Sequence, residues 1–189
     1  MFGQKSALRG CQSVGESRAV TISKPLSQDL IEEARRQWIE HGWDEAADGM
    51  ALVTSIMRIQ QIYLARVNSV LRPLDLTFAR FELLTLLSFT HSGALPMNKI
   101  GVRLQVHPTS VTNSVDRLED QGFVQRRAHA TDRRTTLVEI LPSGRRILQK
   151  ASIVLNESVF AHPGISGAEA KELFHLLRVL RMDEGDFDI

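Results

Sequence analysis

The pattern of hydrophobic and polar positions along the chain is mainly helical. In seven stretches, apolar side chains recur every three or four residues, the spacing that gathers them on one face of an α-helix. These stretches predict helices over residues 27–41, 48–72, 77–90, 97–105, 108–121, 142–160 and 166–182. Residues 123–127 and 136–140 flank a polar stretch and predict a β-hairpin with a charged tip. The fold class that follows is mainly α with a small β-hairpin.

Capping residues mark where several of these helices begin. Ser27 and Thr77 precede apolar helical runs and are expected N-caps, because their hydroxyls accept hydrogen bonds from free backbone N–H groups. Pro108 stands at the first helical position of its helix, where a missing N–H costs nothing. Ser166 and Glu169 have the spacing of a capping box at the start of the last helix.

The helix over 108–121 combines one apolar face with one face of short polar groups. Val111, Val115 and Leu118 share a face and are expected to pack inward. The opposite face supplies the candidate DNA contacts Thr109, Ser110, Thr112, Asn113 and Arg117, together with Asp116 as an expected structural partner. Hydroxyl, amide and guanidinium groups can hydrogen-bond to base edges and phosphates in the major groove. The helix is therefore predicted to be the recognition helix of a helix-turn-helix, with solvent-facing charge or internal pairing of Arg117 as the alternative.

The tip of the predicted hairpin is strongly basic. A charged hairpin beside a recognition helix can reach a neighbouring minor groove, whose negative potential favours arginine. Asp132 lies two residues before Arg134, so its carboxylate can orient that guanidinium before DNA arrives. The candidate DNA contacts here are Arg127, Asp132, Arg133 and Arg134, within a cluster that also holds Arg126 and His129. The alternative is a surface salt bridge of little energetic value.

The charge is distributed unevenly, although the net charge is only +1. Residues 99–150 hold ten Lys/Arg and five Asp/Glu, a net of about +5. The remainder holds thirteen basic and seventeen acidic residues, a net of about −4. A localised basic segment of this kind attracts a phosphate backbone, although a solvated charged surface gives the same count.

A set of motifs stands out in the chain: Leu76-Thr77, Phe81, Leu84, Ser110-Val111-Thr112, Val115-Asp116-Arg117-Leu118-Glu119, Gly122-Phe123-Val124, Asp132-Arg133-Arg134, Leu137 and Leu141-Pro142-Ser143-Gly144. In these motifs the chain resembles the MarR family of bacterial winged helix-turn-helix transcription regulators, most specifically over residues 110–144. The resemblance covers residues 48–182, and it implies a homodimer with intertwined terminal helices and an Asp-x-Arg wing motif at Asp132 and Arg134. Pro142 departs from the threonine that the family usually has after the second wing strand.

These observations predict four parts: a disordered tail over 1–25, N-terminal dimerisation helices over 26–75, a winged helix-turn-helix over 76–142 and C-terminal dimerisation helices over 143–189. The flanking helices carry more apolar surface than one small winged domain can cover, which favours a homodimer. A two-fold dimer reads a pseudo-palindromic stretch of double-stranded DNA. The predicted function is a sequence-specific, ligand-responsive transcription regulator, with repression as the expected mode.

The resemblance also implies an effector pocket where the DNA-binding part meets the dimerisation helices. The candidate lining residues are Trp38, Met57, Tyr63, Phe78, Arg80 and His91, and the expected effector is a small aromatic or acidic molecule. Arg80 suits a carboxylate, although pairing with Glu82, Asp75 or solvent is the slightly favoured alternative. Core packing is the alternative for the apolar members. The helix that carries Trp38 is similar to an added N-terminal helix in the family's urate-responsive branch, but that branch's charged ligand set is not matched.

Several other functions lack a sequence signal. The chain has no nucleophile elbow, phosphate-binding loop or dinucleotide fingerprint, so it is not expected to be an enzyme. The six histidines lack ligand spacing and Cys11 is the single cysteine, so no metal or cofactor is expected. A peroxide-sensing role for Cys11 is disfavoured by its place in the tail. No stretch is long and apolar enough for a membrane span, which favours a cytoplasmic protein. The alternative function is a sequence-independent architectural DNA-binding protein, which normally carries a stronger positive charge.

Overall fold

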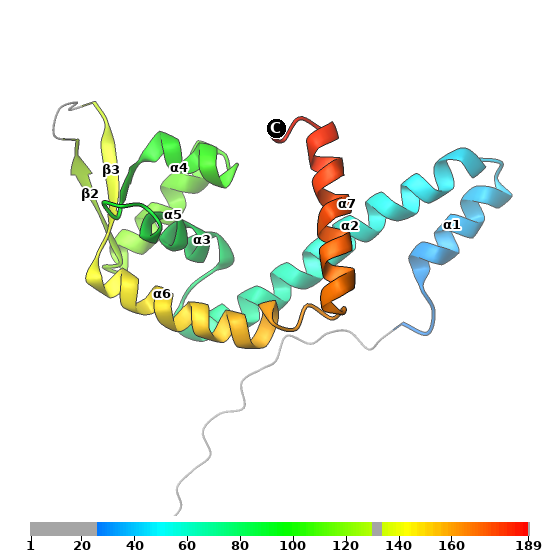
Figure 1. Cartoon of the computed structure of the whole chain (residues 1–189), viewed down its shortest axis with the longest axis horizontal. Coiled ribbons are helices and arrows are strands. Elements are labelled where there is room, and N and C mark those ends of the chain that lie inside the picture. Colours follow the sequence, from blue (N-terminus) through cyan, green and yellow to red (C-terminus); the bar gives the residue numbers. More distant parts are fainter. Residues whose placement is uncertain (1–25, 130–133, 189) are drawn as a thin grey trace, which may run out of the picture.

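The computed structural model describes residues 26–129 and 134–188. The tail over 1–25, with Cys11, and the wing candidates Asp132 and Arg133 lie outside the described residues. In chain order the elements are α1 (Leu30–Glu40), α2 (Asp44–Leu71), the 3₁₀ turn η1 (Arg72–Leu74), α3 (Phe78–Ser88), β1 (Ala94–Pro96), α4 (Met97–Leu104), α5 (Pro108–Asp120), β2 (Val124–Ala128), β3 (Thr136–Ile140), α6 (Pro142–Leu155), the π-helical turn η2 (Asn156–Phe160) and α7 (Gly167–Asp183). The mainly helical fold with a small β wing is confirmed (Figure 1).

The helices from α3 to α5 and the sheet, residues 78–140, form one lobe, from which the long helix α2 projects (Figure 1). α6 runs along the base of the lobe, and α1 packs beside the far end of α2. α7 crosses α2 next to an apolar cavity that both helices line. No helix in the described part of the chain has the length and hydropathy of a membrane span.

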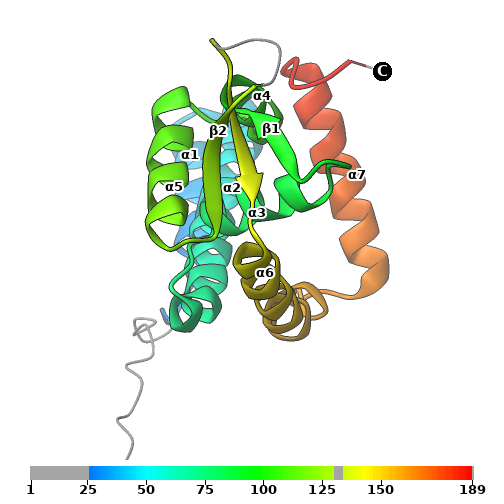
Figure 2. The same cartoon turned by 90° about the vertical axis from the view of Figure 1, so that its left-hand side faces the viewer.

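A three-stranded antiparallel sheet lies at one edge of the lobe, with strand order β1-β3-β2 (Figure 2). β2 and β3 form the predicted hairpin, in which Arg126 lies opposite Val138. The sequence pattern missed β1, because three residues are too few to show alternation. β1 pairs with β3, with Leu95 opposite Val138, and so completes the sheet.

The lobe is built around a continuous apolar core. Val111, Val115 and Leu118 of α5 are at most 2% exposed, which confirms the inward face predicted for this helix. They pack with buried side chains of α3, α4 and β3, among them Leu84, Ile100 and Val138. This packing fixes the rotation of α5 and leaves its polar face outward.

The first two helices begin at different residues from those expected. α1 begins at Leu30 rather than Ser27, because the Asp29 carboxylate accepts hydrogen bonds from the backbone N–H groups of Ile31 and Glu32. α2 begins at Asp44 rather than Asp48. The predicted cap at Thr77 and the capping box of Ser166 with Glu169 are confirmed.

A second difference lies where α6 ends. The predicted helix over 142–160 is α-helical only to Leu155 and continues as the π-helical turn η2. Such turns insert an extra residue into the helix, so the apolar periodicity alone does not reveal them.

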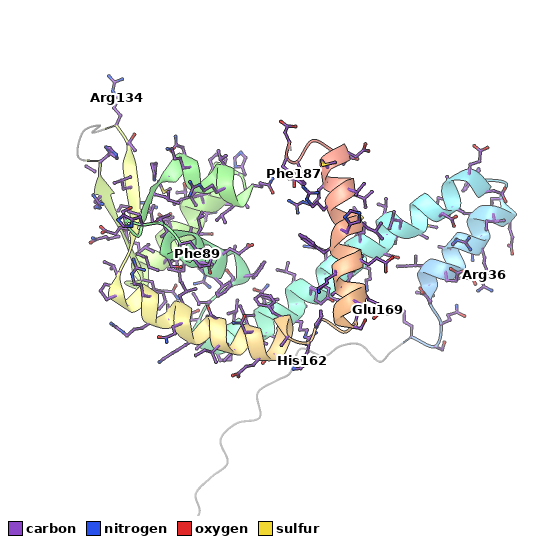
Figure 3. The ribbon with its side chains drawn as sticks, in the orientation of Figure 1. Arg36, Phe89, Arg134, His162, Glu169 and Phe187 are labelled. Carbon is purple, nitrogen blue, oxygen red and sulfur yellow. The ribbon has the colours of Figure 1, made fainter. Side chains whose placement is uncertain are left out.

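The C-terminal end of α7 contacts the lobe. Gly185 adopts a left-handed conformation and the N–H of Asp186 donates to the carbonyl of Arg181, which stops the helix in a Schellman arrangement. The Asp186 carboxylate then accepts hydrogen bonds from Arg181 and from Gln105 in the turn before α5. Phe187 packs beside α7, where the guanidinium of Arg181 stacks on its ring (Figure 3).

Candidate nucleic-acid interface

The turn between α4 and α5 sets the start of the candidate recognition helix. Gln105 has a φ of 53°, a left-handed conformation that turns the chain sharply after α4. The ring Nδ1 of His107 accepts a hydrogen bond from the N–H of Thr109 at 3.2 Å, and Pro108 follows at the first helical position as predicted. α5 therefore starts at a defined residue, next to the turn.

The five candidates on α5 all face solvent. Thr109, Ser110, Thr112, Asn113 and Arg117 are exposed, on the face opposite the buried Val115. Thr112 also donates a hydrogen bond to the carbonyl of Pro108 at 3.1 Å, which leaves its hydroxyl oxygen able to accept. Arg117 forms no ion pair with any described residue. The α5 face thus presents donors and acceptors in the arrangement that a major groove accommodates.

Arg126 connects α5 to the wing. Its backbone N–H donates to Glu119 Oε1 at 2.8 Å, its Nη1 donates to Glu119 Oε2 at 2.5 Å, and its Nη2 pairs with Asp116. Asp116 was expected to be a structural partner, and it forms an ion pair with Arg126. The sequence placed Arg126 in the basic cluster at the wing, but could not show that two carboxylates from α5 neutralise it. We name this group of Asp116, Glu119 and Arg126 the wing clamp.

The wing clamp makes stability depend on pH. The N–H of Arg126 holds the pKa of Glu119 below its ordinary value of 4.5. A carboxyl with a lowered folded-state pKa stabilises the fold above the unfolded pKa, and this contribution disappears as pH falls through the folded value. Glu119→Gln should therefore lower the melting temperature at neutral pH, and the difference from wild type should narrow between about pH 5 and about pH 3.

Thermal unfolding of both proteins across that range measures the effect. Glu172→Gln is the matched control, because Glu172 is an exposed carboxylate of α7 outside the clamp. A difference for Glu119→Gln that stayed constant with pH would contradict the role of the ionised carboxylate.

The remaining wing candidates lie in different surroundings. Arg127 Nε is 2.8 Å from Glu139 Oε2 on the neighbouring strand, and Gln125 donates to the same carboxylate at 3.1 Å. Arg134 is exposed and points away from the body of the lobe at the wing tip (Figure 3). Contact of Arg127 and Arg134 with DNA stays a prediction.

A single chain does not bring the six candidate effector residues into one pocket. Tyr63 and Phe78 line an apolar cavity of about 520 Å³ between α2, η2 and α7. Arg80 lies in a separate polar cleft beside α5, because two positions along a helix turn a side chain by about 200° from Phe78. His91 lines a third depression, next to Phe89. The Trp38 ring packs on Trp43 with centroids 5.1 Å apart, and Met57 is 64% exposed on α2.

Within residues 26–129 and 134–188, no group of three His, Cys, Asp or Glu side chains is placed to hold a metal ion.

Comparison with known proteins fits this geometry. A family model described as MarR family matches residues 76–136, the stretch from two residues before α3 to the first residue of β3. The crystal structure of Sco5413, a MarR family transcriptional regulator from Streptomyces coelicolor, is 48% identical in sequence, with a TM-score of 0.69. The match covers 75% of this chain and 99% of that one. The chain belongs to the MarR family.

Other relatives are more distant. An uncharacterized HTH-type transcriptional regulator of Bacillus subtilis, YhbI, is 29% identical over 84 residues, which are 44% of this chain and 53% of that protein. The chain thus spans about half the length of the curated relatives it matches. Sco3205, a MarR family regulator of Streptomyces coelicolor crystallised with DNA, has the same fold at 18% identity and a TM-score of 0.63, with 71% of this chain and 86% of that one covered. Both relatives carry the description of transcriptional regulators.

Proposed function

We propose that the protein is a sequence-specific, ligand-responsive transcription regulator that represses as a homodimer on a pseudo-palindromic operator. The observation that carries the proposal is the exposed polar face of α5, attached to a basic wing through the wing clamp in a chain of the MarR family. Sco3205 in complex with DNA has the same fold and supports a duplex as the partner.

The terminal helices support the homodimer. Large apolar side chains are exposed along α2 and α7, among them Leu52, Val53, Ile62, Leu173, Phe174, Leu176 and Val179. A monomer rarely leaves a contiguous apolar surface of this kind in water. A two-fold axis through these helices would present two α5 helices to one side of a duplex, about 34–36 Å apart.

Footprinting tests the proposed function. Fragments of the source organism's DNA are selected on the full-length protein, and the bound fragments are then footprinted. We expect protection of one discrete site with two inverted half-sites about one helical turn apart. Uniform protection along every fragment would instead support an architectural DNA-binding protein.

Asn113 is expected to read a base. Asparagine can pair bidentately with adenine, so Asn113→Ala should weaken operator binding by roughly 1–3 kcal/mol per half-site and relax the preference at one base pair. Binding to a set of operators with single base changes measures this. Asn156→Ala, on η2 and outside the α5 face, is the matched control and should bind every operator as wild type does. Equal losses on all operators for Asn113→Ala would mean that this residue contacts the backbone rather than a base.

The effector is expected to be a small aromatic or acidic molecule. CouR from Rhodococcus jostii, which has the same fold, was crystallised with p-coumaroyl-CoA, so aromatic acyl thioesters belong in the test panel with phenolic acids, salicylate and urate. Fluorescence of Trp38 and Trp43 is followed in parallel with operator binding. A true effector changes both signals with one midpoint, and linkage requires that it bind more weakly when operator is present. Compounds that change fluorescence but leave operator affinity unaltered would support constitutive repression instead.

A further inference from the structure

A polar cleft of about 520 Å³ lies between the start of α3 and the C-terminal half of α5. It is lined by Asp75, Thr77, Arg80, Asn113, Ser114, Arg117, Asp120 and Gln121. Two of these residues, Asn113 and Arg117, belong to the exposed face of the candidate recognition helix. The cleft is therefore continuous with the surface that we propose to enter the major groove.

Arg80 is held in a fixed orientation inside this cleft. Its Nε donates to Thr77 Oγ1 at 3.3 Å, and its Nη1 donates to Gln121 Oε1 at 3.1 Å. The Gln121 amide is itself anchored, because its Nε2 donates to Asp75 Oδ2 at 2.8 Å and to the Asp75 carbonyl at 2.9 Å. The Nη2 of Arg80 has no hydrogen-bond partner among the described residues. A guanidinium that is already oriented loses less conformational entropy when an anion binds.

The charges around the cleft fit one anion. Arg117 supplies a second guanidinium that forms no ion pair with a described residue. Of the two carboxylates in the cleft, Asp75 accepts the hydrogen bond of Gln121 and forms no ion pair with Arg80. Asp120 is exposed at the end of α5 and accepts no hydrogen bond from the described residues, so it opposes an anion from one side.

We propose that Arg80 and Arg117 together bind one backbone phosphate of the duplex beside the major groove. This inference rests on the proposed function, and it makes Arg80 a DNA-contacting residue rather than part of the effector pocket. The guanidinium fork matches the oxygens of a phosphate, and a contact to the backbone fixes the orientation of α5 without reading sequence. Arg80 faces away from the apolar cavity of Tyr63 and Phe78, so an effector in that cavity would not reach it.

The test compares the salt dependence of operator binding for Arg80→Gln, Asp120→Asn and wild type. Glutamine removes the charge but can still bond to Gln121. Arg80→Gln should weaken binding to operator and to random duplex alike, by about 5- to 20-fold. It should also reduce the slope of log affinity against log salt by about 0.9 for each phosphate that the variant no longer neutralises. Asp120→Asn should instead strengthen binding to both duplexes by a few fold, because the opposing charge is gone.

Arg146→Gln is the matched control, because it removes the same charge from an exposed position on α6 outside the cleft. If Arg80→Gln had the same slope as Arg146→Gln, the proposal would be overturned, and a lowered melting temperature would then identify Arg80 as a brace for α3 and α5. If Arg80→Gln had the wild-type slope of log affinity against log salt, but an acidic effector no longer released it from operator, Arg80 would belong to the effector site. Footprinting of the wild-type protein tests the proposed function separately. If the wild-type protein selected no discrete operator, the proposed function itself would be overturned.

Discussion

Replacing Phe174 by aspartate is expected to leave each chain folded but to separate the proposed dimer into monomers. Phe174 is 63% exposed in one chain and lines the apolar cavity between α2 and α7, so its loss removes little from the fold of that chain. In a dimer built on these helices, each aspartate would be buried without a partner, which typically costs several kcal/mol. A monomer can then bind only one half-site at a time. Loss of the linked contact with the second half-site should weaken operator binding by roughly 10²–10⁴-fold.

Light scattering at micromolar concentration and operator binding measure the two parts of this expectation. The wild-type protein should give twice 21.2 kDa, and Phe174→Asp should give 21.2 kDa. Phe89→Asp is the matched control: Phe89 is 83% exposed at the end of α3, in the lobe rather than on α2 or α7 (Figure 3). The control should stay dimeric. A Phe174→Asp protein that remained dimeric and bound operator normally would place the interface elsewhere on the chain.

Local signals in the sequence were enough to predict the helices and the wing. The apolar spacing of Val111, Val115 and Leu118 predicted which face of α5 is buried, because that spacing is a direct consequence of 3.6 residues per turn. Thr77 and Pro108 predicted helix starts because each acts on backbone groups within one turn. The candidate recognition helix and its buried face were therefore predictable before any tertiary contact was known.

Contacts between elements were not predictable in the same way. The wing clamp joins Glu119 to Arg126 across the turn at Gly122, and no helical or strand periodicity relates those two positions. Arg80 was a candidate for the effector pocket, with pairing to Glu82, Asp75 or solvent as the slightly favoured alternative. Its rotation about α3 instead directs it to Thr77 and to Gln121 of α5. Such placements follow from how α3 and α5 pack against each other, which the local pattern leaves open.

Gly144→Ala is expected to destabilise the protein even though alanine is the better helix former. A Cβ at Gly144 would collide with the carbonyl oxygen of Phe123 and would lie 2.9 Å from Ile140 Cγ1. The carbonyl cannot move aside easily, because it accepts the hydrogen bond of the Leu141 N–H at 2.9 Å. Overpacking of this kind costs about 1–3 kcal/mol or more, which exceeds the gain of about 1 kcal/mol in helix propensity.

Thermal unfolding and operator binding measure the consequence. A net loss of about 1–2 kcal/mol should lower the melting temperature by about 2–8 °C in a chain of this length. Gly49→Ala is the matched control, since Gly49 lies within α2 and nothing stands within 4 Å of its added Cβ. That variant should gain about 0.5–1 kcal/mol in its free energy of unfolding.

The same collision should affect operator binding. Because β2 follows directly on Phe123, a shift that relieves the collision would also displace the wing. Gly144→Ala should therefore bind operator more weakly than Gly49→Ala at temperatures where both are folded. Equal stability of the two variants would mean that α6 shifts freely against Phe123, and the wing would then not be fixed by this contact.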